Sequence, residues 1–250
     1  MKASAWYRWI IGIAGLSVVI IAHEMGHFAA CKLFHVGTPL FSIGFGPRIA
    51  AFTLKSTTFQ LAALPLGGYV SIDQVSFNAQ SYLVKMIIMI AGIIFNFLFA
   101  LIAFMYLMYG SRSRVEYGTL IAEDFVIQPD APFSRLKTLQ HVSARLFAKE
   151  GSTGLIGPIG IISLAGKSLA YGADLFIFTL ALLSINIGIF NLLPIPGLDG
   201  SQLLALTIEK IVGPLAGSDE WMHMLFFILF ILFMLLITLK DVKKIKHTDQ

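Results

Sequence analysis

The sequence predicts an α-helical integral membrane protein with about four transmembrane helices and a small membrane-associated β-sheet after the first helix. Hydrophobic residues make up 57% of the 250 residues and charged residues only 13%, and the mean hydropathy of +0.81 lies far above that of soluble domains. The chain also has apolar runs long enough to cross hydrocarbon about 30 Å thick, at residues 9–28, 82–109, 175–193 and 222–239. We expect residues 1–250 to form one domain.

Residues 39–72, between the first two spans, have the character of a β-hairpin or small sheet. Threonine and aromatic residues are frequent here, and glycines such as Gly44 and Gly46 interrupt the strand pattern. Two interpretations are open: the sheet caps the helix bundle, or its edge pairs with an unwound substrate by strand addition. In the second case Gly44, Phe45 and Gly46 are candidate substrate-binding residues, because glycine allows another backbone to approach closely.

Residues 110–174, between the second and third spans, are expected to form an extramembrane loop. A Pro-Asp-Ala-Pro turn at residues 129–132 precedes residues 133–150, which have the periodicity of an amphipathic helix. After the third span, Pro194 and Pro196 cannot lie in a regular helix interior, so the chain must unwind there. A further helix is predicted at residues 200–212.

The first span contains His23-Glu24-Met25-Gly26-His27. On a helix, residues i and i+4 lie one above the other, so His23 and His27 can aim two imidazoles at one metal ion. Glu24 projects about 100° around the helix from His23, where it can act on water at the metal without being a ligand. Ionisable groups are costly in hydrocarbon, so this cluster predicts a functional metal site rather than a chance grouping.

A metal site built on two histidines needs a third protein ligand from elsewhere in the chain. Asp199 follows the unwound segment after the third span and is the best candidate. The alternative is that Asp199 caps the helix that follows, and the sequence alone leaves the two readings open. Cys31 lies one turn after His27 and could also serve as a ligand, but a single cysteine among apolar neighbours usually packs in the core.

The remaining composition excludes several classes of function. The net charge of +4 comes from Lys and Arg beside the spans, and no basic stripe with interleaved aromatics indicates binding to nucleic acid. The single cysteine excludes an intrachain disulfide. A metal carrier, or a catalytically silent zinc-binding protein that only holds substrates, is the alternative to an enzyme. A carrier would distribute its ligands along a path, whereas here they form one cluster.

With these motifs in place, the chain resembles the site-2 proteases, which are intramembrane zinc metalloproteases. It is most similar to the bacterial branch that cleaves membrane-bound anti-sigma factors and leftover signal peptides. The likeness rests on His23 to His27 and on Leu198-Asp199-Gly200, and it extends over residues 41–46, 65–70, 157–161 and 186–200.

The resemblance implies a zinc metalloendopeptidase that acts on the transmembrane helices of membrane proteins. It implies His23, His27 and Asp199 as zinc ligands and Glu24 as the base that takes a proton from the attacking water. It also implies a multi-pass protein of the bacterial inner membrane, in contact with the lipid bilayer. The distribution of Lys and Arg favours termini in the cytoplasm. The family instead has its termini outside and its catalytic face in the cytosol. We follow the family orientation.

One departure from the family concerns residues 110–174, which are too short for a PDZ domain with its flanks, so no PDZ-mediated partner is expected. Two asparagines also lie in the predicted spans. Asn96, one turn after Gly92, is interpreted as a helix-packing residue that makes an interhelical hydrogen bond. Asn191, one turn before Pro194, is a candidate for holding the substrate backbone or the oxyanion, with helix packing as its alternative. Asn191 and Pro194 complete the predicted substrate-binding residues.

Overall fold

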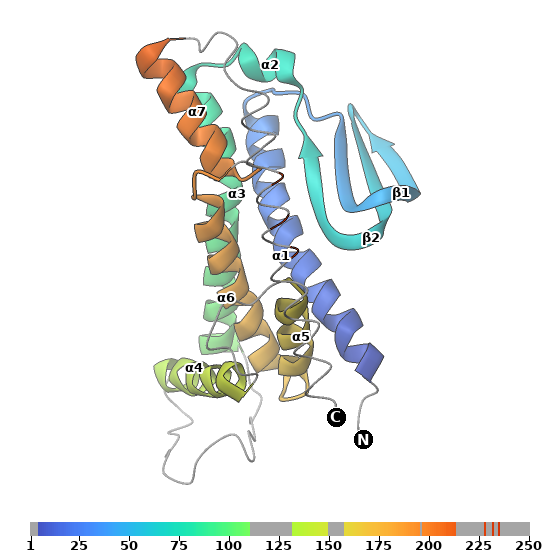
Figure 1. The fold of residues 1–250 in the computed structure, drawn as a ribbon, viewed down its shortest axis with the longest axis vertical. Helices are drawn as coiled ribbons and strands as arrows, with labels where there is room; N and C mark the ends of the chain where they lie inside the picture. The colour runs from blue at the N-terminus through green and yellow to red at the C-terminus, as the bar shows by residue number, and fades with distance from the viewer. Residues whose placement is uncertain are drawn as a thin grey trace. The chain divides into compact units, whose positions relative to one another are not determined.

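The computed structural model describes residues 5–110, 132–149, 158–195 and 197–213, together with Ile228, Leu232 and Leu235 (Figure 1). These residues are mostly helical. The elements, in chain order, are α1 (Ala5–Leu33), β1 (Leu40–Leu54), β2 (Thr57–Ser71), α2 (Gln74–Asn78), α3 (Tyr82–Met105), a π-helical turn η1 (Tyr106–Gly110), α4 (Pro132–Lys149), α5 (Pro158–Leu169), α6 (Ala173–Asn191) and α7 (Asp199–Val212).

Three of the described helices are long and apolar enough to cross a membrane, over Trp6–Leu33, Tyr82–Tyr109 and Ala173–Asn191. They confirm the first three predicted spans, and the first extends several residues beyond the predicted range at each end. The helix α6 ends at Asn191 because Pro194 follows, and proline cannot continue the backbone ladder. The fourth predicted span, residues 222–239, lies outside the described residues apart from Ile228, Leu232 and Leu235, so it stays a prediction.

The chain divides into two compact units. The first comprises Met1–Leu16, Phe99–Leu183 and Met234–Gln250, and the second comprises Ser17–Leu98 and Ser184–Phe233. In the first unit, a core of buried residues joins η1 to α4, α5 and α6; it consists of Leu107, Leu139, Val142, Leu164, Leu175 and Phe178. The buried positions Leu139 and Val142 confirm the amphipathic helix predicted near residues 133–150.

The helix α5 was not predicted from the sequence, which assigned its residues to an extramembrane loop. It packs closely on the first half of α1 through two glycines. A Cβ at Gly12 would overlap the carbonyl of Ile162, and a Cβ at Gly166 would overlap the carbonyl oxygen of Arg8. Twelve residues are too few for a span, so the apolar pattern of α5 could not be distinguished from that of a loop segment.

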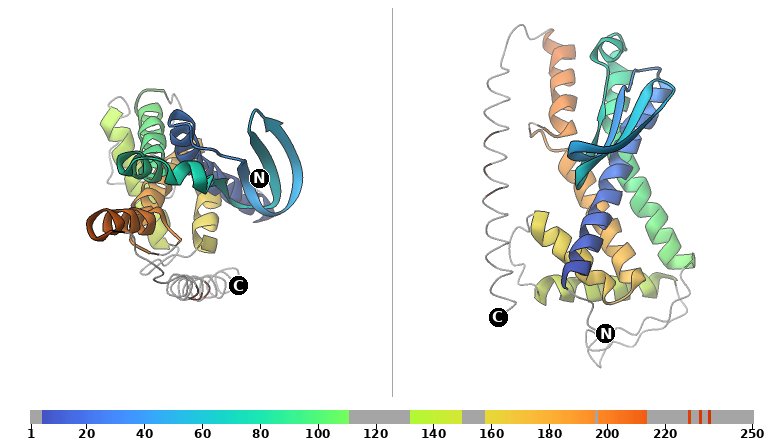
Figure 2. Two further views of the ribbon diagram at one scale, coloured as in Figure 1. Left: turned by 90° about the horizontal axis from the view of Figure 1, so that it is seen from above. Right: turned by 90° about the vertical axis from the view of Figure 1, so that its right-hand side faces the viewer.

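In the second unit, β1 and β2 confirm the predicted sheet, which lies alongside α1 (Figures 1 and 2). Residues 50–54 of β1 pair with residues 57–61 of β2 across the hairpin, and residues 40–43 pair with residues 68–71. Phe59 has partners on both sides, Phe41 and Phe52, because both strands bend. The bend in β1 requires glycine at Gly44, whose φ is +90° and whose Cβ would lie 2.8 Å from the carbonyl oxygen of Leu64.

Several contacts fix the sheet to α1, among them a cluster of aromatic rings and a hydrogen bond to the backbone of β2. The ring of Phe28 lies with its centroid 5.6 Å from those of Phe41 and Phe59, in edge-to-face contacts. The hydroxyl of Ser17 donates a hydrogen bond of 2.7 Å to the carbonyl oxygen of Pro65. These contacts hold β2 beside the part of α1 that carries the histidines.

The close packing of α5 on α1 predicts a difference between two buried helical glycines. Gly166→Ala should destabilise the protein by about 1–3 kcal/mol, because the new methyl group overlaps the Arg8 carbonyl oxygen. Gly188→Ala is the matched control. Its Cβ would lie 3.4 Å from the Asn96 Cβ, which is an ordinary contact, so the midpoint temperature of thermal unfolding should stay the same or rise. Thermal unfolding in detergent measures the stability of both variants. An equal loss of stability in the two variants would contradict the close packing of α5 on α1.

Candidate metal centre

The helix α1 places His23 and His27 on one face, one turn apart, as their spacing predicted. Both side chains are buried, and their Nε2 atoms lie 3.1 Å from each other. The rings meet at an interplanar angle of 79°, so neither is stacked on the other. The two imidazoles therefore point their outer nitrogen atoms at one common volume.

Two glycines bring α3 close enough to hold these rings. A Cβ at Gly26 of α1 would overlap the carbonyl oxygen of Ala91, and a Cβ at Gly92 of α3 would lie 2.8 Å from His23 Nε2. On the same helix, the carbonyl oxygen of Ile88 lies 2.9 Å from His27 Nδ1. This close approach of the two backbones leaves room for the imidazoles and little else.

Asp199 reaches the same volume from the start of α7. Its Oδ2 atom lies 3.1 Å from His23 Nε2 and 3.2 Å from His27 Nε2. The N-cap position of α7 is Leu198, which makes no side-chain capping bond, and Asp199 is the first helical residue. Between the two readings left open by the sequence, the structure therefore brings Asp199 to the histidines and does not make it the cap.

Gly200 allows the chain to turn into α7 at this point. A Cβ there would overlap the carbonyl oxygens of Leu192 and Leu193, the two residues that follow α6. Farther along α7, Leu203 and Leu206 pack against a buried cluster that includes Cys31 of α1 and Ile88 of α3. The first turn of α7 is thus fixed against both helices, and Cys31 packs in the core outside the ligand group, as expected.

The hydrogen bonds around His27 decide which of its atoms can act as a ligand. The carbonyl oxygen of Ile88 can only accept a hydrogen bond, so the proton of a neutral His27 must be on Nδ1. Its Nε2 then carries a lone pair, directed at His23 Nε2 and Asp199 Oδ2. Asp199 Oδ2 is itself buried without a hydrogen-bond donor among the described residues. Lone pairs and a carboxylate directed at one point repel one another unless a metal ion, or a proton carried by one of the rings, lies between them.

The donor set fits a metal ion. One ligand atom from each of His23, His27 and Asp199 lies within 4.8 Å of the others, and they form a three-residue ligand group. Burial raises the pKa of Asp199, but when the two imidazoles carry protons in place of a cation, their hydrogen bonds and positive charge outweigh it and lower this pKa to about 2. Asp199 is therefore ionised at neutral pH and supplies the negative charge that a divalent cation needs.

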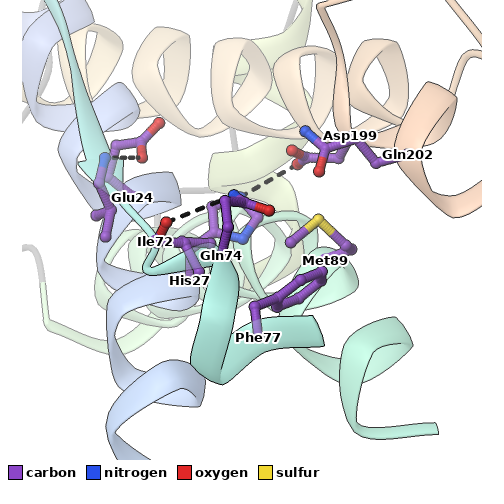
Figure 3. A pocket seen from close by; sticks show the side chains of 9 residues that line it. Glu24, His27, Ile72, Gln74, Phe77, Met89, Asp199 and Gln202 are labelled. Atoms are coloured by element: carbon purple, nitrogen blue, oxygen red, sulfur yellow. Dashed lines mark hydrogen bonds and ion pairs between the residues drawn. The ribbon is translucent and has the colours of Figure 1, made fainter. Parts of the chain in front are cut away.

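Glu24 lies beside this group and takes no part in it. Its Oε2 atom accepts a hydrogen bond of 3.0 Å from the backbone N–H of Val70 in β2. Glu24, His27 and Asp199 open onto a cavity of about 210 Å³ (Figure 3). The cavity is also lined by Val70, Ile72, Gln74, Phe77, Met89 and Gln202.

The five predicted substrate-binding residues lie outside this cavity lining. Gly44 and Gly46 are at the bend of β1, both with positive φ, and the ring of Phe45 stacks on Tyr69 with centroids 6.0 Å apart. Asn191 donates a hydrogen bond of 3.1 Å back to the carbonyl oxygen of Ile187, and Pro194 is exposed. Their contact with substrate stays a prediction.

Val70 and Asn96 contact Glu24 and His23 without having been assigned to the site from the sequence, and Ser184 in turn contacts Asn96. The Asn96 amide lies 3.1 Å from His23 Nδ1, where the sequence had indicated only packing and an interhelical hydrogen bond. The available signal was a polar residue in an apolar span, one turn after a glycine. A polar residue in a span does not indicate which group its amide contacts.

The sequence pattern of peptidase family M50 matches residues 11–236, which include the histidine pair, the sheet and Asp199. This chain belongs to peptidase family M50. Three relatives, each carrying the name "Putative zinc metalloprotease", come from different bacteria. The chain is 25% identical to the protein of Fusobacterium nucleatum, over 88% of this chain and 96% of the relative. It is 25% identical to that of Rickettsia conorii, over 82% and 90%, and 24% identical to that of Helicobacter pylori, over 81% and 89%.

The alignment with the Fusobacterium nucleatum protein extends over 328 positions. This exceeds the 250 residues of the present M50 family member, so the relative carries inserted segments that this chain lacks. With these insertions counted, the alignment spans 96% of the relative.

The geometry of this M50 site predicts how Asp199 variants bind metal. Asp199→Ala should lower the bound divalent metal strongly, whereas Asp199→Glu should retain much of it, because a carboxylate is required and its reach is secondary. Cys31→Ser is the control and should bind like the original protein, since Cys31 packs with the core cluster. Elemental analysis of the purified proteins measures the stoichiometry. Unchanged metal content in Asp199→Ala would remove Asp199 from the ligand set.

Proposed function

We propose that this protein is an intramembrane zinc metalloendopeptidase of the site-2 type, which hydrolyses peptide bonds in or near the transmembrane helices of membrane proteins. The observation that carries the proposal is the meeting of His23, His27 and Asp199 beside Glu24, because both histidines lie within the candidate span Trp6–Leu33. Membership of peptidase family M50 and relatives named as zinc metalloproteases support the same chemistry.

Zinc suits the ligands that this site offers. Two imidazole nitrogens and one carboxylate oxygen form a donor set that catalytic zinc sites use, with a fourth position left for water or substrate. When bound, zinc acts as a Lewis acid, which lowers the pKa of water and polarises a carbonyl group. Within the chain, His23 and His27 of α1 and Asp199 of α7 would hold the ion.

Glu24 is proposed as the general base and acid. Its carboxylate faces the cavity next to the ligand group without joining it, so it is free to take a proton from the attacking water. The same carboxyl then returns the proton to the amine that leaves when the peptide bond breaks. Its hydrogen bond to the Val70 N–H fixes one oxygen and leaves the other for this exchange.

A substrate helix must unwind before its peptide bond can be attacked, because its carbonyl groups are held in internal hydrogen bonds. The segment of β2 at residues 68–71 is suited to receive the unwound backbone. Residues 40–43 of β1 pair with this segment on one side, and the Val70 N–H points away from β1 towards Glu24. The backbone groups of Gly68 and Val70 therefore face the site, since alternate residues of a strand direct their N–H and C=O groups to the same side.

We infer substrates with transmembrane helices, such as anti-sigma factors or remnant signal peptides, in a bacterial inner membrane with the catalytic face towards the cytosol. No PDZ-mediated partner and no nucleic acid is part of the proposal. A metal carrier or an inactive substrate-binding protein is disfavoured, because the candidate ligands among the described residues form a single cluster and Glu24 lies next to it.

The proposed role of Glu24 predicts a clean separation of activity from metal binding. Glu24→Gln should abolish cleavage of a membrane-embedded substrate, by about 100-fold or more, while the protein stays folded and keeps its zinc. Cleavage in reconstituted vesicles and zinc content are measured on the same preparation. Joint loss of zinc and activity would make Glu24 a ligand, and retained cleavage would contradict the protease assignment.

Strand addition predicts that a change at the β2 edge affects substrates unequally. Val70→Pro removes the backbone donor at the site, so turnover of a substrate with a stable helix should fall more than turnover of one with Gly and Pro near the scissile bond. The ratio of the two rates at equal zinc occupancy is the measurement, because any effect on Glu24 is common to both substrates. An unchanged ratio of the two rates would indicate that the sheet only caps the helix bundle. Gly44→Val is unsuitable for this comparison, since it disturbs the bend of β1 itself.

A further inference from the structure

Asn96 is a fully buried asparagine of α3 whose amide lies against a proposed ligand. Its side chain is 3.1 Å from His23 Nδ1, on the opposite edge of the ring from the Nε2 atom that faces Asp199. The hydroxyl of Ser184 in α6, also fully buried, lies 2.9 Å from the Asn96 backbone oxygen and 3.2 Å from the Asn96 Oδ1 atom. Ser184, Asn96 and His23 thus form one chain of contacts that ends at the ligand group.

The number of protons limits how these groups can be bonded once a cation is present. A histidine that holds a cation through Nε2 carries its proton on Nδ1, and that proton needs an acceptor. For His27 the acceptor is the Ile88 carbonyl oxygen, which has no proton and can only accept a hydrogen bond. For His23 the partner is an amide, which can either donate or accept. With the Asn96 NH₂ group towards His23, two donors would face each other.

Rotation of the amide by about 180° resolves this conflict and satisfies every group. The Asn96 Oδ1 atom then accepts from His23 Nδ1–H, and the NH₂ group donates to the Ser184 oxygen. Ser184 has a single proton, which it donates to the Asn96 backbone oxygen at 2.9 Å. Each donor has one acceptor in this arrangement, and the amide is held from both sides.

Simple packing does not account for an asparagine at this position. A buried amide costs free energy unless its hydrogen bonds are satisfied, and leucine would fill a similar volume in an apolar span at no such cost. The amide is therefore held at the one place where it meets a ligand ring.

We propose that Asn96 is a positioning residue which accepts the Nδ1 proton of His23, with Ser184 fixing the orientation of the amide, so that His23 presents its Nε2 lone pair to the metal ion. This inference rests on the metal site of the proposed function. It assigns to Asn96 and Ser184 an effect on metal affinity that acts through His23 and requires no contact with the ion.

The test compares zinc affinity in the full-length protein, measured by competition with a chelator. Asn96→Leu, of similar volume but without an acceptor, should bind zinc about 10- to 100-fold more weakly. Asn96→Asp keeps an acceptor at the same place and should bind within a few-fold of the original protein or more tightly. Ser184→Ala should give a smaller loss, because the amide remains but is no longer fixed.

Thr179→Val is the matched control. Thr179 is another buried hydroxyl of α6, and it donates only to its own helix, at 2.8 Å from the Leu175 carbonyl oxygen. The Thr179→Val variant should bind zinc with the same affinity as the unmodified protein. The visible spectrum of the Co²⁺-substituted protein gives a second readout, which should change in Asn96→Leu and not in Thr179→Val. If Asn96→Leu fails to fold, Asn96→Asp and Ser184→Ala still decide the matter.

Two results would overturn the inference while leaving the proposed function intact. One is that Asn96→Leu binds zinc as tightly as the unmodified protein does. If Asn96→Leu does not fold, the same result in Ser184→Ala would count. The other is an equal loss in Asn96→Asp and Asn96→Leu, which would indicate packing alone. Absence of zinc binding by the unmodified protein is different, because it would contradict the proposed function together with this inference.

Discussion

The second compact unit is organised around three atoms that offer lone pairs to one point. His23 Nε2, His27 Nε2 and Asp199 Oδ2 lie within about 3 Å of one another in a buried place. Such an arrangement needs positive charge between the atoms, either a metal ion or a proton carried by one imidazole, so the remaining structure must hold the ligands close together. The surrounding glycines, the interrupted helix and the buried amide can all be understood from this requirement.

Close approach of backbones is the means by which the ligands are held. Gly26 and Gly92 let α1 and α3 come near enough for the Ile88 carbonyl to meet His27. Gly200 lets the chain turn sharply from the end of α6 into α7, which delivers Asp199. Each of these positions excludes even a methyl group, because neighbouring backbone occupies that space at Gly26 and Gly200 and the imidazole rings occupy it at Gly92. The cavity beside Glu24 then remains as the open side of the site.

The sequence predicted those features that depend on local periodicity. The histidine pair follows from the helical repeat, and the three described spans follow from the length of their apolar runs. Asp199 could be proposed only by elimination, because the choice between a ligand and a helix cap depends on the backbone at Leu198. Zinc and the family followed from motifs, and the match over residues 11–236 establishes the family.

Features that depend on which segments meet in space were beyond the sequence. The helix α5 is short, and its role appears only where Gly166 meets Arg8. The sheet was predicted, but its edge at residues 68–71 depends on the register between β1 and β2, which a sequence pattern does not fix. For the same reason the candidates Gly44, Phe45 and Gly46 were chosen for backbone freedom, whereas Val70 carries the contact with Glu24. Asn96 was recognised as a polar residue in a span, but its partner His23 was not.

We expect one divalent metal ion to be bound by two imidazoles and one carboxylate of this chain. X-ray absorption spectroscopy at the zinc edge, on the full-length protein in detergent, tests this most directly. We expect only nitrogen and oxygen neighbours of the zinc ion, with the multiple-scattering signature of two histidine rings. A sulfur neighbour, which Cys31 is the one cysteine able to supply, or the signature of a single imidazole would contradict it.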